Sequence, residues 1–96
     1  MVDTHKDKRR IREAKKRAIE MLADVGYDVI PSDNSRVCLT ATRDTEIRFI
    51  RIVIDKITPQ DMEIMKGLQS PDFSICKKEI WCSPYGSKKF KKERVN

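Results

Sequence analysis

The sequence predicts an α/β domain in which a mixed sheet is flanked by helices. An amphipathic helical pattern spans residues 5–25, a β-branched run spans Ile47–Asp55, and a capped helix start at Thr58 precedes a further apolar strand. Helical and strand patterns that follow one another in this way favour helices packed on a sheet. The 96 residues have the length of one domain, so we expect residues 1–96 to fold as a single unit.

The run Ile47–Asp55 is predicted to be the central strand. Strand alternation places Ile50 and Ile52 on one face, and Arg51 and Val53 on the other. Both faces of the run are largely apolar, which is typical of a strand covered by layers on both sides. Arg51 therefore needs a polar partner or water, because an unpaired buried charge is costly.

The pattern over 5–25 predicts a helix with one apolar stripe and one basic face. The stripe recurs at spacings of three and four and consists of Ile11, Ala14, Ala18, Leu22 and Val25. The opposite face carries Arg9, Arg12 and Lys16. Gly26 stands where a glycine commonly ends a helix. We expect the stripe to pack on the sheet and the basic face to meet solvent.

Short strands are predicted on the N-terminal side of the central strand. Residues 27–30 and 36–42 favour strands, and turn-forming residues at 31–35 and 43–45 separate them. Because the connections are short, we expect these two strands and 47–55 to form an antiparallel meander.

A second helix and one or two further strands are predicted after the central strand. Thr58 can cap the helix, Pro59 suits its first position, and Asp61 favours the helix N-terminus electrostatically. Residues 78–83 form the next predicted strand. Residues 88–95 are predicted as either an edge strand or a frayed helix, and the pattern leaves both open.

The formal net charge of +6 is concentrated at the two ends of the chain. Residues 6–17 contain eight Lys or Arg and two acids, and 88–94 contain five and one, whereas 18–87 contain eight basic and eleven acidic residues. We expect residues 1–8 to be a frayed basic N-terminus and 88–96 a basic tail. This asymmetry indicates a polyanionic partner, although charged ends can equally serve only to keep a small domain soluble.

Nucleic acid is the polyanion that the basic ends suggest. The candidate phosphate-contacting residues are Arg9, Arg12, Lys16, Lys88, Lys89, Lys91 and Lys92. No set of residues suits the reading of base edges, so we expect no strong sequence preference. Trp81 lies among lysines and could stack on bases, but its size favours a place in the core.

The order helix, three strands, helix, strand resembles the restriction-endonuclease-like fold of the PD-(D/E)XK nuclease superfamily, especially its small members related to Holliday-junction resolvases. The resemblance covers roughly residues 9–83. It rests on Tyr27-Asp-Val-Ile30 after the first helix, on Val37-Cys-Leu-Thr-Ala41 where the family has an Asp-containing strand, on Ile50-Arg-Ile-Val53 where it has Glu-x-Lys, and on a Trp after the second helix. It implies an α-β-β-β-α-β core.

The resemblance does not extend to the catalytic residues. The family's metal-binding Asp falls at Cys38, which is not a hard oxygen ligand for magnesium. Its Glu-x-Lys pair falls on Arg51 and Val53, where Arg repels a metal ion and Val cannot activate water. Glu13 is the counterpart of the family's glutamate in the first helix. The resemblance therefore implies a catalytically degenerate nuclease fold with no cofactor, which binds nucleic acid, most readily DNA, or serves as a non-catalytic subunit beside a larger nuclease partner.

Two other functions remain open from the sequence. Asp33, Asp44 and Glu46 could form a displaced Mg²⁺ site of an active endonuclease, although acids at such positions also simply favour turns. Alternatively, the chain could be a small protein-interaction module, for example a homodimer through a sheet edge or a helix face.

The remaining sequence features predict a cytoplasmic location without a membrane partner. No apolar run reaches the roughly 18 residues of a membrane span, and the basic N-terminus leads into a charged helix instead of a signal-peptide core. The three cysteines lack zinc-type spacing and are expected to be reduced, with a disulfide between Cys76 and Cys82 as the alternative. The only histidine, His5, lies in the segment that is expected to fray. A Ser-His-Asp or Cys-His catalytic centre is therefore not expected.

Overall fold

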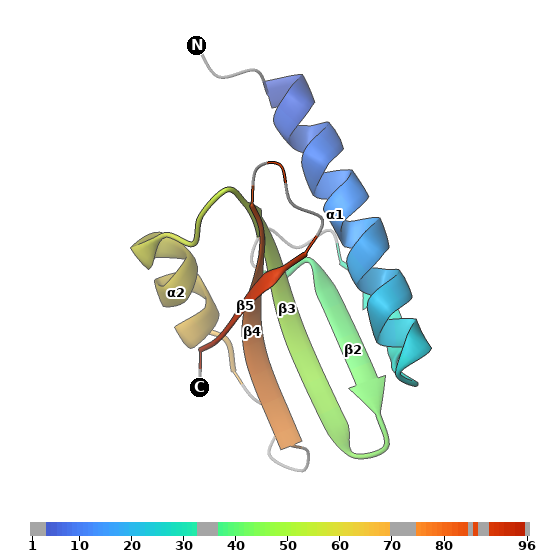
Figure 1. Ribbon diagram of the computed structural model, residues 1–96. Helices are drawn as coiled ribbons and strands as arrows, with labels where there is room; N and C mark the ends of the chain where they lie inside the picture. Colours follow the sequence, from blue (N-terminus) through green and yellow to red (C-terminus); the bar gives the residue numbers. More distant parts are fainter. Residues whose placement is uncertain (1–3, 33–36, 70–74, 85, 87–88, 96) are drawn as a thin grey trace.

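The computed structural model describes residues 4–32, 37–69, 75–84, 86 and 89–95. Two helices and five strands follow one another along the chain (Figure 1). Their bounds are α1 Thr4–Asp24, β1 Asp28–Pro31, β2 Leu39–Arg43, β3 Glu46–Ile54, α2 Pro59–Lys66, β4 Ile75–Ser83 and β5 Lys91–Arg94.

The five strands form one mixed sheet in the order β1-β2-β3-β4-β5. β1, β2 and β3 make the predicted antiparallel meander. β4 pairs with β3 in parallel over nine residues, and β5 pairs antiparallel with β4. The predicted mixed sheet with flanking helices is confirmed, and so is the central position of the strand at 47–55.

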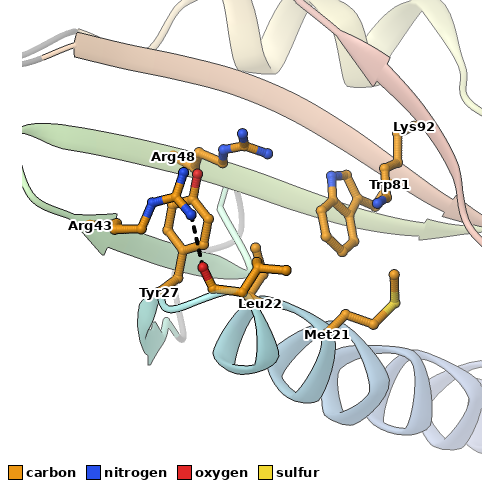
Figure 2. Close-up of a pocket in the computed structure, with 8 residues that line it drawn as sticks. Met21, Leu22, Tyr27, Arg43, Arg48, Trp81 and Lys92 are labelled. Carbon is orange, nitrogen blue, oxygen red and sulfur yellow. Dashed lines mark hydrogen bonds between the residues drawn. The ribbon is translucent and has the colours of Figure 1, made fainter.

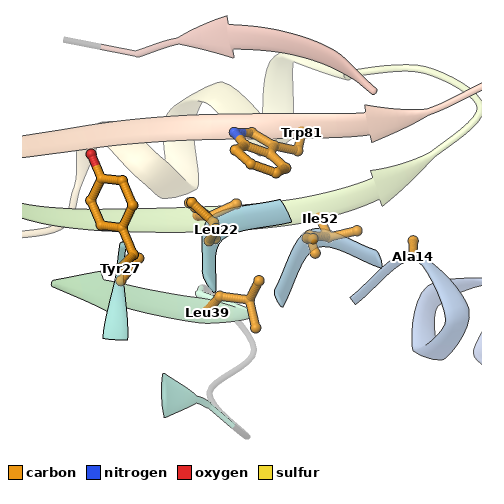
Figure 3. Packing of buried hydrophobic residues seen from close by; sticks show 9 residues of the cluster. Ala14, Leu22, Tyr27, Leu39, Ile52 and Trp81 are labelled. Carbon is orange, nitrogen blue, oxygen red and sulfur yellow. The ribbon is translucent and has the colours of Figure 1, made fainter. Parts of the chain in front are cut away.

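The two helices cover opposite faces of the sheet. Ile50 and Ile52 of β3 pack in one cluster with Ala14, Ala18 and Leu22 of α1 (Figure 3). The neighbouring residue Arg51 points to the other face and contacts Asp61 of α2. Ile50 is 0% exposed and Ile52 is 4% exposed, which confirms the prediction that both are buried. Small alanines on α1 let the helix lie close to the strands.

Val25 does not belong to the buried stripe, contrary to the prediction. α1 ends at Asp24, and Val25 is 57% exposed. Gly26 has a φ of +92°, a conformation that residues with a side chain rarely adopt, and it turns the chain out of the helix. Tyr27 takes the inward position instead and is 5% exposed.

Two strands follow the central strand after α2, and their bounds differ from those that the sequence predicts. β4 begins at Ile75, three residues before the predicted start, because β3 offers a parallel partner along its whole length. Lys91–Arg94 is an edge strand, which decides between the two alternatives for this part of the chain. Trp81 of β4 is 2% exposed, so its place in the core is confirmed.

The predicted strand at 36–42 pairs regularly only from Leu39 onward, and Arg36 lies outside the described residues. Cys38 directly precedes β2, and its thiol accepts a hydrogen bond from the Ile52 amide at 3.3 Å. The thiol thus supplies a partner to β3 where β2 no longer does.

All three cysteines are free. The alternative of a disulfide between Cys76 and Cys82 is therefore wrong. Both residues lie on β4, and six residues of extended chain separate them by roughly 20 Å, far beyond the reach of a disulfide.

Among the described residues, no helix has both the length and the apolar composition that a bilayer crossing requires.

The predicted partner of Arg51 is Asp61, at the start of α2. Arg51 Nε donates to Asp61 Oδ1 at 3.0 Å. Asp61 also completes a capping box with Thr58, whose backbone amide and hydroxyl donate to Oδ2 at 2.9 and 2.8 Å. Burial opposes ionisation of Asp61, but these hydrogen bonds outweigh it and lower the pKa of the carboxyl. One carboxylate therefore both begins α2 and fixes that helix to the central strand.

We expect Arg51→Met to lower the free energy of unfolding by about 1–3 kcal/mol, because it leaves a buried carboxylate short of a charged donor. Urea unfolding followed by circular dichroism measures this. The matched control is Lys66→Met, which removes an exposed ion pair with Glu63 at 4.0 Å and should cost no more than about 0.5 kcal/mol. Equal effects of the two substitutions would contradict the proposed role of the pair.

Candidate functional site

A pocket of about 310 Å³ lies between the end of α1 and the sheet (Figure 2). Its apolar part is formed by three residues near the helix end, Met21, Leu22 and Val25, and by the rings of Tyr27 and Trp81. Its charged part consists of three cations from three different strands, Arg43, Arg48 and Lys92. No acidic side chain is among the residues that line it.

The strand register brings these residues to one face. Ile52 pairs with Trp81 across β3 and β4, and Trp81 pairs with Lys92 across β4 and β5. Residues paired in this way point to the same side of a sheet. Arg48 precedes Ile52 by four residues and so shares its face. The pocket therefore lies on the face that α1 covers, at the C-terminal end of the helix.

Arg43 is fixed at one end of the pocket. Its guanidinium lies 4.4 Å from the centroid of the Tyr27 ring, and Nη1 donates to the Val25 carbonyl at 2.8 Å. The side chain thus satisfies a carbonyl just after α1, where helical partners are lacking. A cation over an aromatic ring gains roughly 0.5–1 kcal/mol at an exposed site.

Lys92 is fixed at the other end of the pocket. Its Nζ lies 4.3 Å from the centroid of the Trp81 ring, and Figure 2 shows it on the opposite side of the pocket from Arg43. The ring of Phe90 also packs near Trp81, with the two ring centroids 5.3 Å apart. Lys92 is exposed, whereas the ring beneath it is buried.

Arg48 lies between two glutamates. It pairs with Glu46 at 3.3 Å and with Glu79 at 3.2 Å, and its guanidinium lies 5.1 Å from the centroid of the Tyr27 ring. Glu79 also accepts a hydrogen bond from Trp81 Nε1 at 3.0 Å. The two carboxylates therefore orient the side chains that form the pocket and do not themselves line it.

Glu46 is the most strongly perturbed group of this network. It accepts hydrogen bonds from Lys77 Nζ at 2.7 Å and from the Tyr27 hydroxyl. These contacts, that of Lys77 first, lower the pKa of Glu46 to about 2. Burial, followed by the hydrogen bond to Glu46, raises the pKa of Tyr27, so its hydroxyl keeps the proton that it donates.

The network leaves a positive charge over the pocket. Arg48 and Lys77 are matched by Glu46 and Glu79. Within the described part of the chain, neither Arg43 nor Lys92 forms an ion pair with an acid. The mouth of the pocket thus carries two cations that are available to an anionic ligand.

The residues predicted to contact nucleic acid fall into two groups. Arg9, Arg12 and Lys16 are exposed on the side of α1 away from the sheet, since each lies far around the helix from buried Ala14 and Ala18. Arg9 pairs with Glu13 at 3.4 Å. Lys91 and Lys92 are exposed on β5, Lys89 is exposed just before this strand, and Lys88 lies outside the described residues.

The structure separates Lys91 from Lys92. Adjacent residues of a strand point to opposite faces, so Lys92 faces Trp81 and the pocket, while Lys91 faces the α2 side with its partner Cys82. Arg43 and Arg48 were not predicted as residues of the same site as Lys92. Strand alternation places Arg48 on one face with Ile50 and Ile52, but it does not reveal which other strands supply cations to that face.

The acids of the displaced nuclease site are not brought together in what the structure describes. Asp33 lies outside the described residues, and Asp44 is exposed with a φ of +53° in the turn between β2 and β3. Glu46 is already engaged by two cations and a tyrosine. Within 4–32, 37–69, 75–84, 86 and 89–95, no group of three or more His, Cys, Asp or Glu side chains could hold a metal ion.

The residues at positions 38, 51 and 53, where the resemblance places the catalytic residues of the nucleases, have structural roles here. The Cys38 thiol bonds to the backbone of Ile52, and Arg51 pairs with Asp61. Val53 is partly buried beside them on β3. None of these side chains supplies an oxygen ligand for magnesium.

The network predicts how stability depends on pH. Glu46 has a pKa of about 2 in the fold against 4.5 ordinarily. Because the folded pKa is depressed, its stabilisation is complete above about pH 4.5 and is lost as the pH falls toward 2. We expect Glu46→Gln to reduce the slope of unfolding free energy against pH in this window, measured by urea titrations. Tyr27→Phe removes one donor and should move the loss to higher pH, and identical profiles for all three proteins would refute the assignment.

No protein family, no curated protein and no solved structure gave a match to this chain.

Proposed function

We propose that the protein binds nucleic acid through its phosphates and does not cleave it. The observation that carries the proposal is the exposure of Arg9, Arg12 and Lys16 on the outer face of α1. Clustered cations on one helix face attract a polyanion independently of sequence. The chain's formal charge of +6 has the same sign.

The division of the basic residues of α1 supports this interpretation. Arg10 pairs with Asp55 at 2.7 Å, and Arg17 donates to the Ser83 hydroxyl at 2.8 Å. These two side chains attach the helix to the ends of β3 and β4. Within the residues that the structure describes, Arg12 and Lys16 make no such attachment to the sheet, and both are exposed.

The residues on and beside the central strand support the proposal that the protein does not cleave nucleic acid. The order α1-β1-β2-β3-α2-β4 is the order that the resemblance to nucleases implies. The positions where those nucleases carry metal ligands hold Cys38, Arg51 and Val53. The guanidinium of Arg51 would oppose a metal ion there, and it is held in place by Asp61.

We expect binding to duplex DNA to weaken steeply with salt, with a slope near −0.9 in log K against log salt for each phosphate neutralised. Replacing Arg9, Arg12 and Lys16 together by Ala should flatten the slope by up to about three. The control is the pair Lys56→Ala and Lys66→Ala, exposed lysines outside α1. A triple variant that keeps the wild-type slope would leave the basic face as a solubility feature and favour the protein-interaction module.

We expect no cleavage of duplex, single-stranded or branched DNA with magnesium or manganese. Isothermal calorimetry should likewise detect no magnesium site of ordinary affinity. The active-nuclease alternative makes the opposite prediction, namely a magnesium site that Asp33→Ala, Asp44→Ala or Glu46→Gln removes together with the activity. That outcome would overturn the non-catalytic proposal.

A further inference from the structure

We propose that the pocket between α1 and the sheet holds one unpaired nucleotide of a single strand, with the phosphates on its two sides bound by Arg43 and Lys92. This inference rests on the proposed function and assigns it a preferred form of nucleic acid. It starts from the positions of the two cations at opposite ends of one apolar pocket (Figure 2).

The charge of the pocket favours an anionic ligand. Arg43 and Lys92 have no acidic partner in the described chain. The two nearby carboxylates, Glu46 and Glu79, already form ion pairs with Arg48 and Lys77. Both free cations are also held in position by rings, at 4.4 Å from the Tyr27 centroid and 4.3 Å from the Trp81 centroid. Their order before binding reduces the entropy lost when a ligand is bound.

The separation of the cations indicates two anionic groups and not one. A single phosphate at one end would leave the other cation and the apolar surface between them unused. A nucleotide within a strand has a phosphate on each side of its sugar and base. The volume of about 310 Å³ is at the lower end of the range for small-ligand sites, which suits one such unit.

The apolar surface between the cations suits a sugar and base. Met21 is 41% exposed and Leu22 is buried behind it, so a flexible thioether forms the movable wall of the pocket. The faces of Tyr27 and Trp81 already lie beneath cations. Because cations already lie over both rings, the bound base is held by packing against α1 instead of by stacking on them.

A paired base cannot enter the pocket without leaving its stack, and unstacking and unpairing a base costs free energy. The pocket thus favours single strands, loops and strand ends over intact duplex. The outer face of α1, in contrast, can contact phosphates of either form. The ratio of single-strand to duplex affinity separates the two surfaces.

The experiment measures affinity for a fluorescent oligothymidine strand and for a duplex of equal length at several salt concentrations. Lys92→Gln and Arg43→Gln should each weaken single-strand binding roughly two- to fivefold, as for a surface ion pair, and lower its salt slope by about 0.7. Duplex binding should change less. The matched control is Lys91→Gln, the same change one residue away on the opposite face of β5, which should leave the ratio unaltered.

A charge-neutral variant tests the pocket itself. Met21→Trp fills the space at an exposed position and should lower single-strand affinity without changing duplex affinity. Circular dichroism and the fluorescence of the native Trp81 in the Gln variants check that each protein is folded. Equal effects of Lys91→Gln and Lys92→Gln, or single-strand binding that ignores Met21→Trp, would overturn the pocket while leaving phosphate binding by α1 intact. Binding to neither form at low salt would overturn both.

Discussion

The parallel pairing of β3 with β4 is the constraint on which the rest of the structure depends. Two parallel neighbours cannot be joined by a tight turn, so the chain must leave the sheet and return. The connection contains α2, and it covers the face to which Arg51 points. α1 then has only the other face to cover. Each of the two central strands thereby presents alternate residues to two different layers.

The face under α1 changes character along β3 toward the C-terminal end of the helix. Ile50 and Ile52 lie beneath the helix, whereas Arg48 lines the pocket at the helix end and pairs there with Glu46. Gly26 sets this boundary by turning the chain out of α1. Polar side chains beyond the helix cannot be buried without partners, and the ion-paired network beneath the pocket provides them. The apolar core and the charged site are thus two ends of one surface.

Features that depend on neighbours in sequence could be predicted. The cap at Thr58, the alternation of the central strand and the need of Arg51 for a partner all follow from local rules. The prediction that Val25 is buried was wrong because it extended the helical periodicity as far as Val25. The chain turns out of the helix there, at Gly26. The start of β4 was missed because Lys77, Lys78 and Glu79 interrupt its apolar pattern and its pairing partner is distant in sequence.

The pocket could not be predicted, because its cations come from β2, β3 and β5 and meet only through the register of the strands. Charge alone identifies Lys92 as a candidate and groups it with Lys91. The sequence does not distinguish the two lysines, since the face of an edge strand is fixed only by the strand beside it. The basic face of α1, which needs only helical periodicity, was in contrast predictable.

The edges of the sheet have a consequence for how the protein behaves at high concentration. All four residues of β5 are charged and exposed, so a second strand approaching this edge meets side chains that must be desolvated. The other edge, β1, ends in Pro31, which has no amide hydrogen to offer. Short, charged or proline-containing edges are the devices by which natural sheets resist edge-to-edge aggregation. A chain with a long, largely apolar central strand is thereby protected against the addition of further strands that could lead to fibrils.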